Sequence, residues 1–313
     1  MNTPRGQEPW APLVLVLGLA GLIVMADNWV VSPLLPSIAR TMGGSVLGIS
    51  FLGQGMSMAV GGTIAAFAGW RWVFIAYGIV GLLVMGVLVR KGRSLPPEPT
   101  VGRGPLIRPY RHLLGRWRSL RIYLVAFGEG VFILGLFSYL GALLVERHGL
   151  GPLGVGLSLT AFGAASVIFG RLSGRVAGRI GRVNLIGLAL LVGGVAALVL
   201  SQVANLPLSL VAIFALGAAF MLAHSSVLTI ATELAAQHRG VAMSLVAFAF
   251  MGGGALGTTL AGRVVATRGF QSYLFIWGVG LVALGIAARI ALAGAEARSG
   301  RSVPAPVSDA RPS

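Results

Sequence analysis

The sequence contains no cysteine and few acidic residues. Eight Asp and Glu residues stand against 24 Lys and Arg residues, and charged residues make up only 10% of the chain. The absence of cysteine excludes disulfides and thiolate metal sites. Soluble domains carry about 25% charged residues, so the scarcity of charge argues against a soluble domain. The mean hydropathy of +0.88 points instead to a membrane protein.

The apolar residues come in long runs rather than at scattered positions. A membrane-spanning helix needs about 20 such residues, and a helix satisfies its own backbone hydrogen bonds in lipid. The sequence therefore predicts an all-α polytopic membrane protein with about nine transmembrane helices. The candidate spans are roughly 11–34, 46–68, 72–90, 121–145, 152–173, 183–203, 206–230, 241–262 and 271–293.

A polar stretch between the third and fourth spans divides the chain. It runs from Arg90 to Arg121, contains several prolines, and sets many basic residues against a single acid, Glu98. Cytoplasmic loops are enriched in Arg and Lys, and clustered prolines favour loops. We therefore expect four segments: a shortened N-terminal transmembrane bundle (1–90), a central cytoplasmic loop (91–120), a C-terminal six-helix transmembrane bundle (121–295) and a disordered cytoplasmic tail (296–313).

Other function classes find little support. The net charge of +16 does not indicate nucleic-acid binding, because the arginines fall between apolar runs rather than on one soluble face. "GGGALG" (252–257) matches a dinucleotide-binding pattern, but no strand precedes it, so we interpret it as a helix-packing segment. No P-loop, zinc-protease or nucleophile-elbow motif occurs. No enzyme activity, cofactor or metal is predicted.

Two stretches of the chain look like copies of one another. "GWRWVFIAYGIVGLL" (69–83) resembles "GFQSYLFIWGVGLVAL" (269–284), and each follows a glycine-rich helix. Each copy and the glycine-rich helix before it form a matched pair; four predicted spans precede the second pair within its half of the chain, whereas one precedes the first pair. We therefore expect the N-terminal half to lack counterparts of three helices. The charges that flank the first span leave its orientation open.

Several motifs, in order along the chain, resemble the major facilitator superfamily. "MADNWVVSPLLPSIA" (25–39) is similar to the end of that family's first helix, and "GGTIAAFAGWRWVF" (61–74) to its fifth helix running into the sixth. "GRVAGRIGR" (174–182) is similar to a loop signature of the family, with Gly178 where an aspartate would be. The resemblance implies a two-bundle fold, here with three plus six helices, and the drug- or sugar-efflux branch of proton antiporters.

Four residues are candidates for the transport or proton pathway. Glu129 lies well inside a predicted span, where an ionised carboxylate facing lipid is costly, so we expect it to face the bundle interior. His224 lies in mid-span and could titrate near neutral pH, although the neighbouring hydroxyls often bond only their own helix. The family resemblance makes Asp27 a candidate, against the alternative of an interfacial helix end. Gln54 is a candidate solute contact.

The basic stripe between the fifth and sixth spans is a candidate cytoplasmic gate. If the helix continues, its four arginines share one face and its glycines share another, where small residues let helices approach closely. The arginines are Arg171, Arg175, Arg179 and Arg182, and the glycines are Gly170, Gly174 and Gly178. The resemblance implies a gate that latches and releases, while the alternative is a loop kept in the cytoplasm by its charge. The gating-loop residues are Gly174, Arg175, Gly178, Arg179, Gly181 and Arg182.

These patterns together favour a secondary active transporter of the cell inner membrane. It would export a small organic solute by alternating access, with protons as the coupling ion. Its expected partners are the lipid bilayer, a small-molecule substrate and protons, and homo-oligomer formation stays open. The alternative is a shortened, non-transporting relative or membrane partner protein, since three missing helices would open one wall of a transport cavity.

Overall fold

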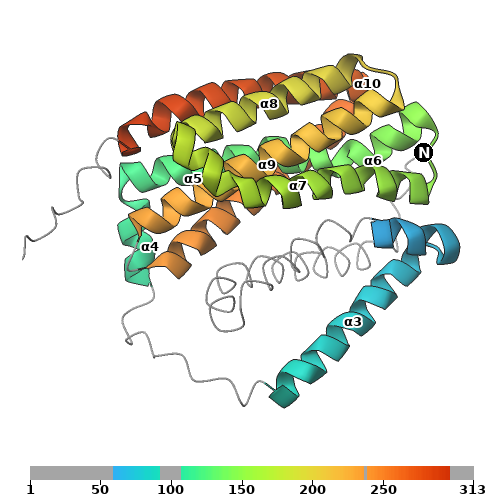
Figure 1. The fold of residues 1–313 in the computed structure, drawn as a ribbon, viewed down its shortest axis with the longest axis horizontal. Coiled ribbons are helices and arrows are strands. Elements are labelled where there is room, and N and C mark those ends of the chain that lie inside the picture. Colours follow the sequence, from blue (N-terminus) through green and yellow to red (C-terminus); the bar gives the residue numbers. More distant parts are fainter. Residues whose placement is uncertain (1–58, 92–106, 236–237, 297–313) are drawn as a thin grey trace, which may run out of the picture. The chain divides into compact units, whose positions relative to one another are not determined.

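The computed structural model describes residues 59–91, 107–235 and 238–296, and every regular element in these ranges is a helix. A short apolar helix, Ala59–Ala68, precedes α3 (Trp70–Lys91). After the gap come α4 (Ile107–Leu114), α5 (Trp117–Glu129), the π-helical turn η2 (Gly130–Leu134) and α6 (Gly135–His148). They are followed by α7 (Pro152–Ile180), α8 (Arg182–Gln202), α9 (Leu206–Leu234) and α10 (Arg239–Glu296) (Figure 1).

Five stretches of the described chain are long and apolar enough to cross a membrane. They are Trp117–His148, Pro152–Ile180, Arg182–Gln202, Leu206–Leu234 and Arg239–Ala293. The last consists of two helices, 239–268 and 270–296, that meet at Gly269 with a φ of 76°. The described part of the C-terminal half therefore holds six spanning helices. The fold is all-α and polytopic, as the apolar runs predict.

The segment predicted as the central cytoplasmic loop contains a helix. α4 occupies 107–114, and α5 begins at Trp117 rather than at residue 121. Leu113 of α4 is buried, at 3% exposure, and so fixes the short helix against the bundle. The sequence analysis missed α4 because its apolar residues are too few for a span and are interleaved with basic residues and a proline.

The predicted internal repeat has a backbone counterpart. Gly69 and Gly269, the first residues of the two similar stretches, both have positive φ, at 89° and 76°. Each lies between two helices, where the chain needs a left-handed conformation that glycine adopts at little cost. The two copies therefore share a glycine-broken helix pair as well as similar residues.

Glycines allow α10 to pack directly on the backbone of α5 and η2. A Cβ built on Gly253 would overlap the carbonyl oxygen of Phe127, and one on Gly257 would overlap that of Val131. These glycines are four residues apart, so they lie on one face of α10. Small residues at this spacing permit close helix approach in membranes. The packing interpretation of "GGGALG" is thereby confirmed.

Two aromatic side chains of α10 hydrogen-bond to the same region. The Tyr273 hydroxyl donates to the carbonyl oxygen of Gly135 at 2.7 Å, and the Trp277 indole donates to that of Val131 at 3.1 Å. A π-turn shifts the helical hydrogen-bond register, so carbonyl groups around it need other donors. These bonds therefore stabilise the irregular turn between α5 and α6.

We expect Tyr273→Phe to destabilise the bundle by about 1–2 kcal/mol, because it leaves the buried Gly135 carbonyl without its hydroxyl donor. Unfolding in mixed detergent micelles, followed by circular dichroism, measures this difference. Tyr110→Phe is the matched control, since the Tyr110 hydroxyl bonds the exposed Ser244 at 3.3 Å and water can replace it. Equal losses in the two variants would contradict the assignment.

Candidate functional site

Glu129 and His224, predicted separately from the sequence, are in direct contact. Nδ1 of His224 lies 2.8 Å from Oε2 of Glu129, although the two residues are 95 positions apart. Glu129 has 0% exposure and His224 has 3%. Glu129 is the last residue of α5 and His224 lies in the second half of α9, so the contact ties these two helices together.

The pair lies deep within its helices. Glu129 follows Trp117, the first residue of α5, by 12 positions, which is about 18 Å along a helix at about 1.5 Å per residue. The hydrocarbon core of a bilayer is about 30 Å thick. If Trp117 marks the interface, as tryptophan often does, Glu129 lies near the middle of the bilayer.

Aromatic rings enclose the imidazole. The ring of Phe220 stacks on His224 with centroids 5.3 Å apart, and the ring of Phe250 lies at 4.6 Å. Phe220 and Phe250 also stack on each other at 5.7 Å. These rings keep the surroundings of the pair apolar, which strengthens the electrostatic interaction between its members.

The backbone around Glu129 is shaped by glycine. A Cβ on Gly130 would overlap the carbonyl oxygen of Phe250, and one on Gly128 would contact Leu284 at 2.7 Å. α10 therefore approaches the chain closely on both sides of Glu129. The π-turn η2 begins at the residue after Glu129, and such turns occur often at functional sites.

The geometry of the pair suits it to hold a proton. With the carboxylate ionised, the Nδ1–H group of the imidazole donates to Oε2; with the carboxyl protonated, its O–H group donates to Nδ1. A carboxylate beside a neutral imidazole has one net negative charge, and one added proton makes the pair neutral. Since net charge is costly in an apolar interior, gaining or losing this proton changes the energy of the site substantially.

One oxygen of the carboxyl group lacks a protein partner within the described ranges. Oε1 of Glu129 is buried and accepts no hydrogen bond from residues 59–91, 107–235 or 238–296. Buried polar groups are nearly always hydrogen-bonded. This oxygen of the pair therefore has spare hydrogen-bonding capacity.

The basic stripe is divided between two helices. α7 ends at Ile180, and Gly181, with a φ of 83°, turns the chain so that Arg182 begins α8. The four arginines therefore do not share one helix face, because the helix does not continue to Arg182. Nη2 of Arg182 lies 3.2 Å from Oε1 of Glu233, near the end of α9.

The close helix approach expected at the stripe glycines is not seen. A Cβ built on Gly174 or Gly178 would meet no atom of the described residues within 4 Å, whereas one on Gly170 would meet Met221 at 3.3 Å. Arg171, Arg175 and Arg179 are exposed. In the described part of the chain, the glycine face of α7 is therefore open beyond Gly170.

We expect Glu233→Gln to change the melting temperature very little. The side chains of Arg182 and Glu233 are 37% and 57% exposed, and exposed ion pairs contribute about 0–1 kcal/mol to stability. Thermal unfolding in detergent measures this. If Glu233→Gln lowered the free energy of unfolding by more than about 2 kcal/mol, the pair would be far better shielded from solvent than its exposure indicates.

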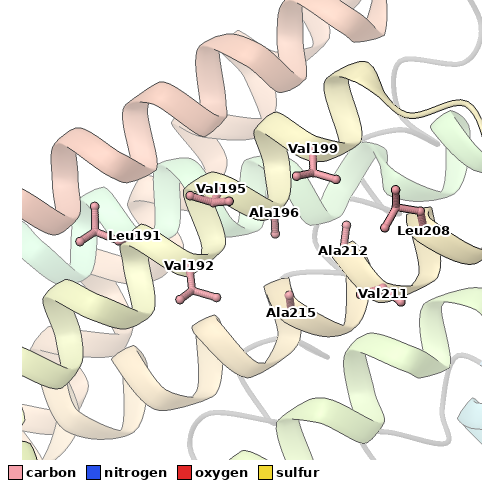
Figure 2. Close-up of a pocket in the computed structure, with 9 residues that line it drawn as sticks. All are labelled: Leu191, Val192, Val195, Ala196, Val199, Leu208, Val211, Ala212 and Ala215. Atoms are coloured by element: carbon pink, nitrogen blue, oxygen red, sulfur yellow. The ribbon is translucent and has the colours of Figure 1, made fainter.

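A separate pocket of about 370 Å³ lies between α8 and α9. Figure 2 shows apolar side chains of both helices around it, among them Val195 of α8 and Val211 of α9. No polar or titratable side chain lines it, and it contains neither Glu129 nor His224. We therefore assign it no part in proton or solute chemistry.

The hydroxyls that neighbour His224 in sequence bond only their own helix. Ser226 donates to the carbonyl oxygen of Leu222 at 2.8 Å and Thr229 to that of Ser225 at 2.7 Å, as the sequence analysis allowed. Asp27 and Gln54 lie outside the described residues. Sequence reasoning missed Phe250, because nothing in its local pattern separates it from other apolar residues of its helix.

The spans and the buried polar pair define an integral membrane protein of the all-α polytopic class. The family model of the Major Facilitator Superfamily matches residues 41–258 and again residues 142–311. The chain belongs to the major facilitator superfamily. It is also 24% identical over 273 residues to the "Uncharacterized MFS-type transporter YceJ" of Bacillus subtilis (strain 168), covering 83% of this chain and 68% of that protein. Both matches support a membrane transporter rather than an enzyme.

Proposed function

We propose that this protein is a proton-coupled secondary transporter of the efflux type, which moves a small organic solute across the inner membrane by alternating access. The observation that carries the proposal is the buried pair of Glu129 and His224, 2.8 Å apart between α5 and α9. Ionisable residues within membrane spans are costly and usually belong to ion or substrate pathways. The family membership supports transport as the general activity.

The pair would couple the proton to the solute through its charge. In the proton-loaded state the site is neutral and can be buried at little electrostatic cost. After proton release the carboxylate needs a compensating partner, and Oε1 of Glu129 is the oxygen that a cationic or hydrogen-bonding solute would reach. Binding of solute and binding of proton then exclude each other, which is the requirement for exchange in opposite directions.

The basic residues at the α7–α8 turn would form the cytoplasmic gate. The contact between Arg182 and Glu233 joins the start of α8 to the end of α9, and an exposed pair of this kind is weak enough to open and close. Arg175 and Arg179 are exposed on the preceding turns of α7 and can engage further carboxylates. Asp27 and Gln54 stay candidates for the opposite wall of the pathway.

A reconstituted system tests the proposal directly. The purified chain is placed in liposomes that contain a pH-sensitive dye, and organic cations, neutral drugs and sugars are added in turn under an imposed pH gradient. We expect at least one solute to cause proton movement above that of empty liposomes. Solute flux that ignores the pH gradient would contradict proton coupling. Correct insertion with no flux of any solute would favour the non-transporting alternative.

A further inference from the structure

The segment from Tyr110 to Trp117 presents large apolar side chains to the surroundings of the bundle. Tyr110 is 37% exposed, Leu114 45% and Trp117 60%. They lie at the N-terminal end of the span Trp117–His148, where the chain enters the bilayer. Aromatic residues favour the membrane interface. This surface is therefore placed to meet the headgroup region of one leaflet.

Basic residues are interleaved with these apolar ones. Arg111, Arg116 and Arg118 are exposed, and no Asp or Glu occurs between residues 107 and 128. In the described part of the chain, none of these three arginines forms an ion pair. Among the residues that the structure describes, the surface therefore has several positive charges with no carboxylate paired to them.

The surface is held in place by the bundle. Leu113 is buried at 3% exposure, and Nη1 of Arg121 donates to the carbonyl oxygen of Ala291 at 3.0 Å. The guanidinium of Arg121 also lies over the Trp117 ring, 5.4 Å from its centroid. Because α4 is anchored through Leu113 and Trp117 through Arg121, the exposed arginines Arg111, Arg116 and Arg118 belong to a segment whose backbone is held against the bundle.

We propose that α4 and the first turn of α5 form a binding surface for anionic phospholipid headgroups. The phosphates would lie against Arg111, Arg116 and Arg118, while Leu114 and Trp117 enter the boundary between headgroups and acyl chains. Arginine suits this partner because its guanidinium binds phosphate in a bidentate manner. An apolar edge beside a basic patch is also the pattern by which helices lie in a membrane interface.

The absence of cysteine permits a local measurement. Leu114→Cys gives the chain a single thiol for a fluorophore, and the protein is placed in lipid nanodiscs. Quenching by brominated phosphatidylglycerol is compared with quenching by brominated phosphatidylcholine at equal mole fraction. We expect the anionic lipid to quench several-fold more strongly, since each arginine near a membrane surface contributes roughly a five-fold preference. Raising the salt concentration should reduce the difference, because it screens exposed charges.

Two controls separate a specific surface from general positive charge. Arg111→Gln, Arg116→Gln and Arg118→Gln together should bring the two lipids to equal quenching. The same change at Arg171, Arg175 and Arg179, which are also exposed, should leave the preference intact. Equal quenching by the two lipids in the protein that keeps all its arginines would overturn the proposal. So would the same loss of lipid preference in both triple variants. The salt response tests it without any change to the arginines.

Discussion

Glu129→Gln is expected to reduce proton-coupled solute flux to the level of empty liposomes. Glutamine has nearly the same shape as glutamate, and its side-chain oxygen can still accept a hydrogen bond from Nδ1 of His224. It cannot bind or release a proton, however, so the pair loses the charge change on which coupling depends. Proton movement and solute flux are measured together in the liposome system with its internal pH dye.

The folded state should tolerate this substitution. Glu129 is fully buried; glutamine fills nearly the same volume without a charge that must be desolvated, and its amide oxygen keeps the hydrogen bond from His224. Detergent unfolding and size-exclusion profiles of the variant should therefore match those of the parent chain. This readout separates loss of coupling from loss of fold.

Glu146→Gln is the matched control for Glu129→Gln. Glu146 lies on α6, in the same span Trp117–His148, and is exposed. The change removes the same carboxylate from the same span, yet we expect unaltered coupled flux. Full proton coupling in Glu129→Gln would show that Glu129 is not part of the proton pathway. Equal losses of coupled flux in both variants would indicate that the change of charge affects membrane insertion.

The double variant Gly253→Ala with Gly257→Ala is expected to have the largest effect on assembly. Each added methyl group would overlap a backbone carbonyl oxygen, that of Phe127 or that of Val131. A backbone carbonyl cannot rotate away as a flexible side chain can, so α10 must move away from α5 and η2. Overpacking in a core costs about 1–3 kcal/mol for each site, which makes several kcal/mol for the pair.

The matched control is Gly174→Ala with Gly178→Ala. These glycines also lie four residues apart within a helix, but no described atom comes within 4 Å of an added Cβ. Alanine is favoured over glycine in a helix by about 1 kcal/mol, so this variant should be at least as stable as the parent. Detergent unfolding and size-exclusion profiles compare the two variants. Equal stability would show that α10 does not pack closely on α5.

Movement of α10 away from α5 should also alter the surroundings of Glu129 and His224. Gly253 and Gly257 face the backbone on either side of Glu129, and Phe250 lies one turn before Gly253 on α10 and against His224. Moving α10 outward would open the aromatic enclosure of the imidazole. We therefore regard the glycine face of α10 as part of what positions Glu129 and His224.

The class of protein and the main candidate residues follow from the sequence alone. Apolar runs of sufficient length predict spanning helices because the bilayer has a definite thickness. A carboxylate in such a run is conspicuous because it is costly there, and Glu129 was identified for that reason. These inferences rest on local composition, which can be read from each stretch of the sequence without knowledge of the fold.

The contact between Glu129 and His224 was decided by the tertiary structure. The two residues lie 95 positions apart, and each helix could present its polar side chain to several neighbours. Their meeting depends on how α5, α9 and α10 pack, and on glycines whose use becomes visible only when the opposing backbone is known. The end of α7 at Ile180 and the π-turn after Glu129 likewise reflect small backbone differences between nearly equal local conformations. Packing decides between such conformations, and packing is a property of the assembled helices.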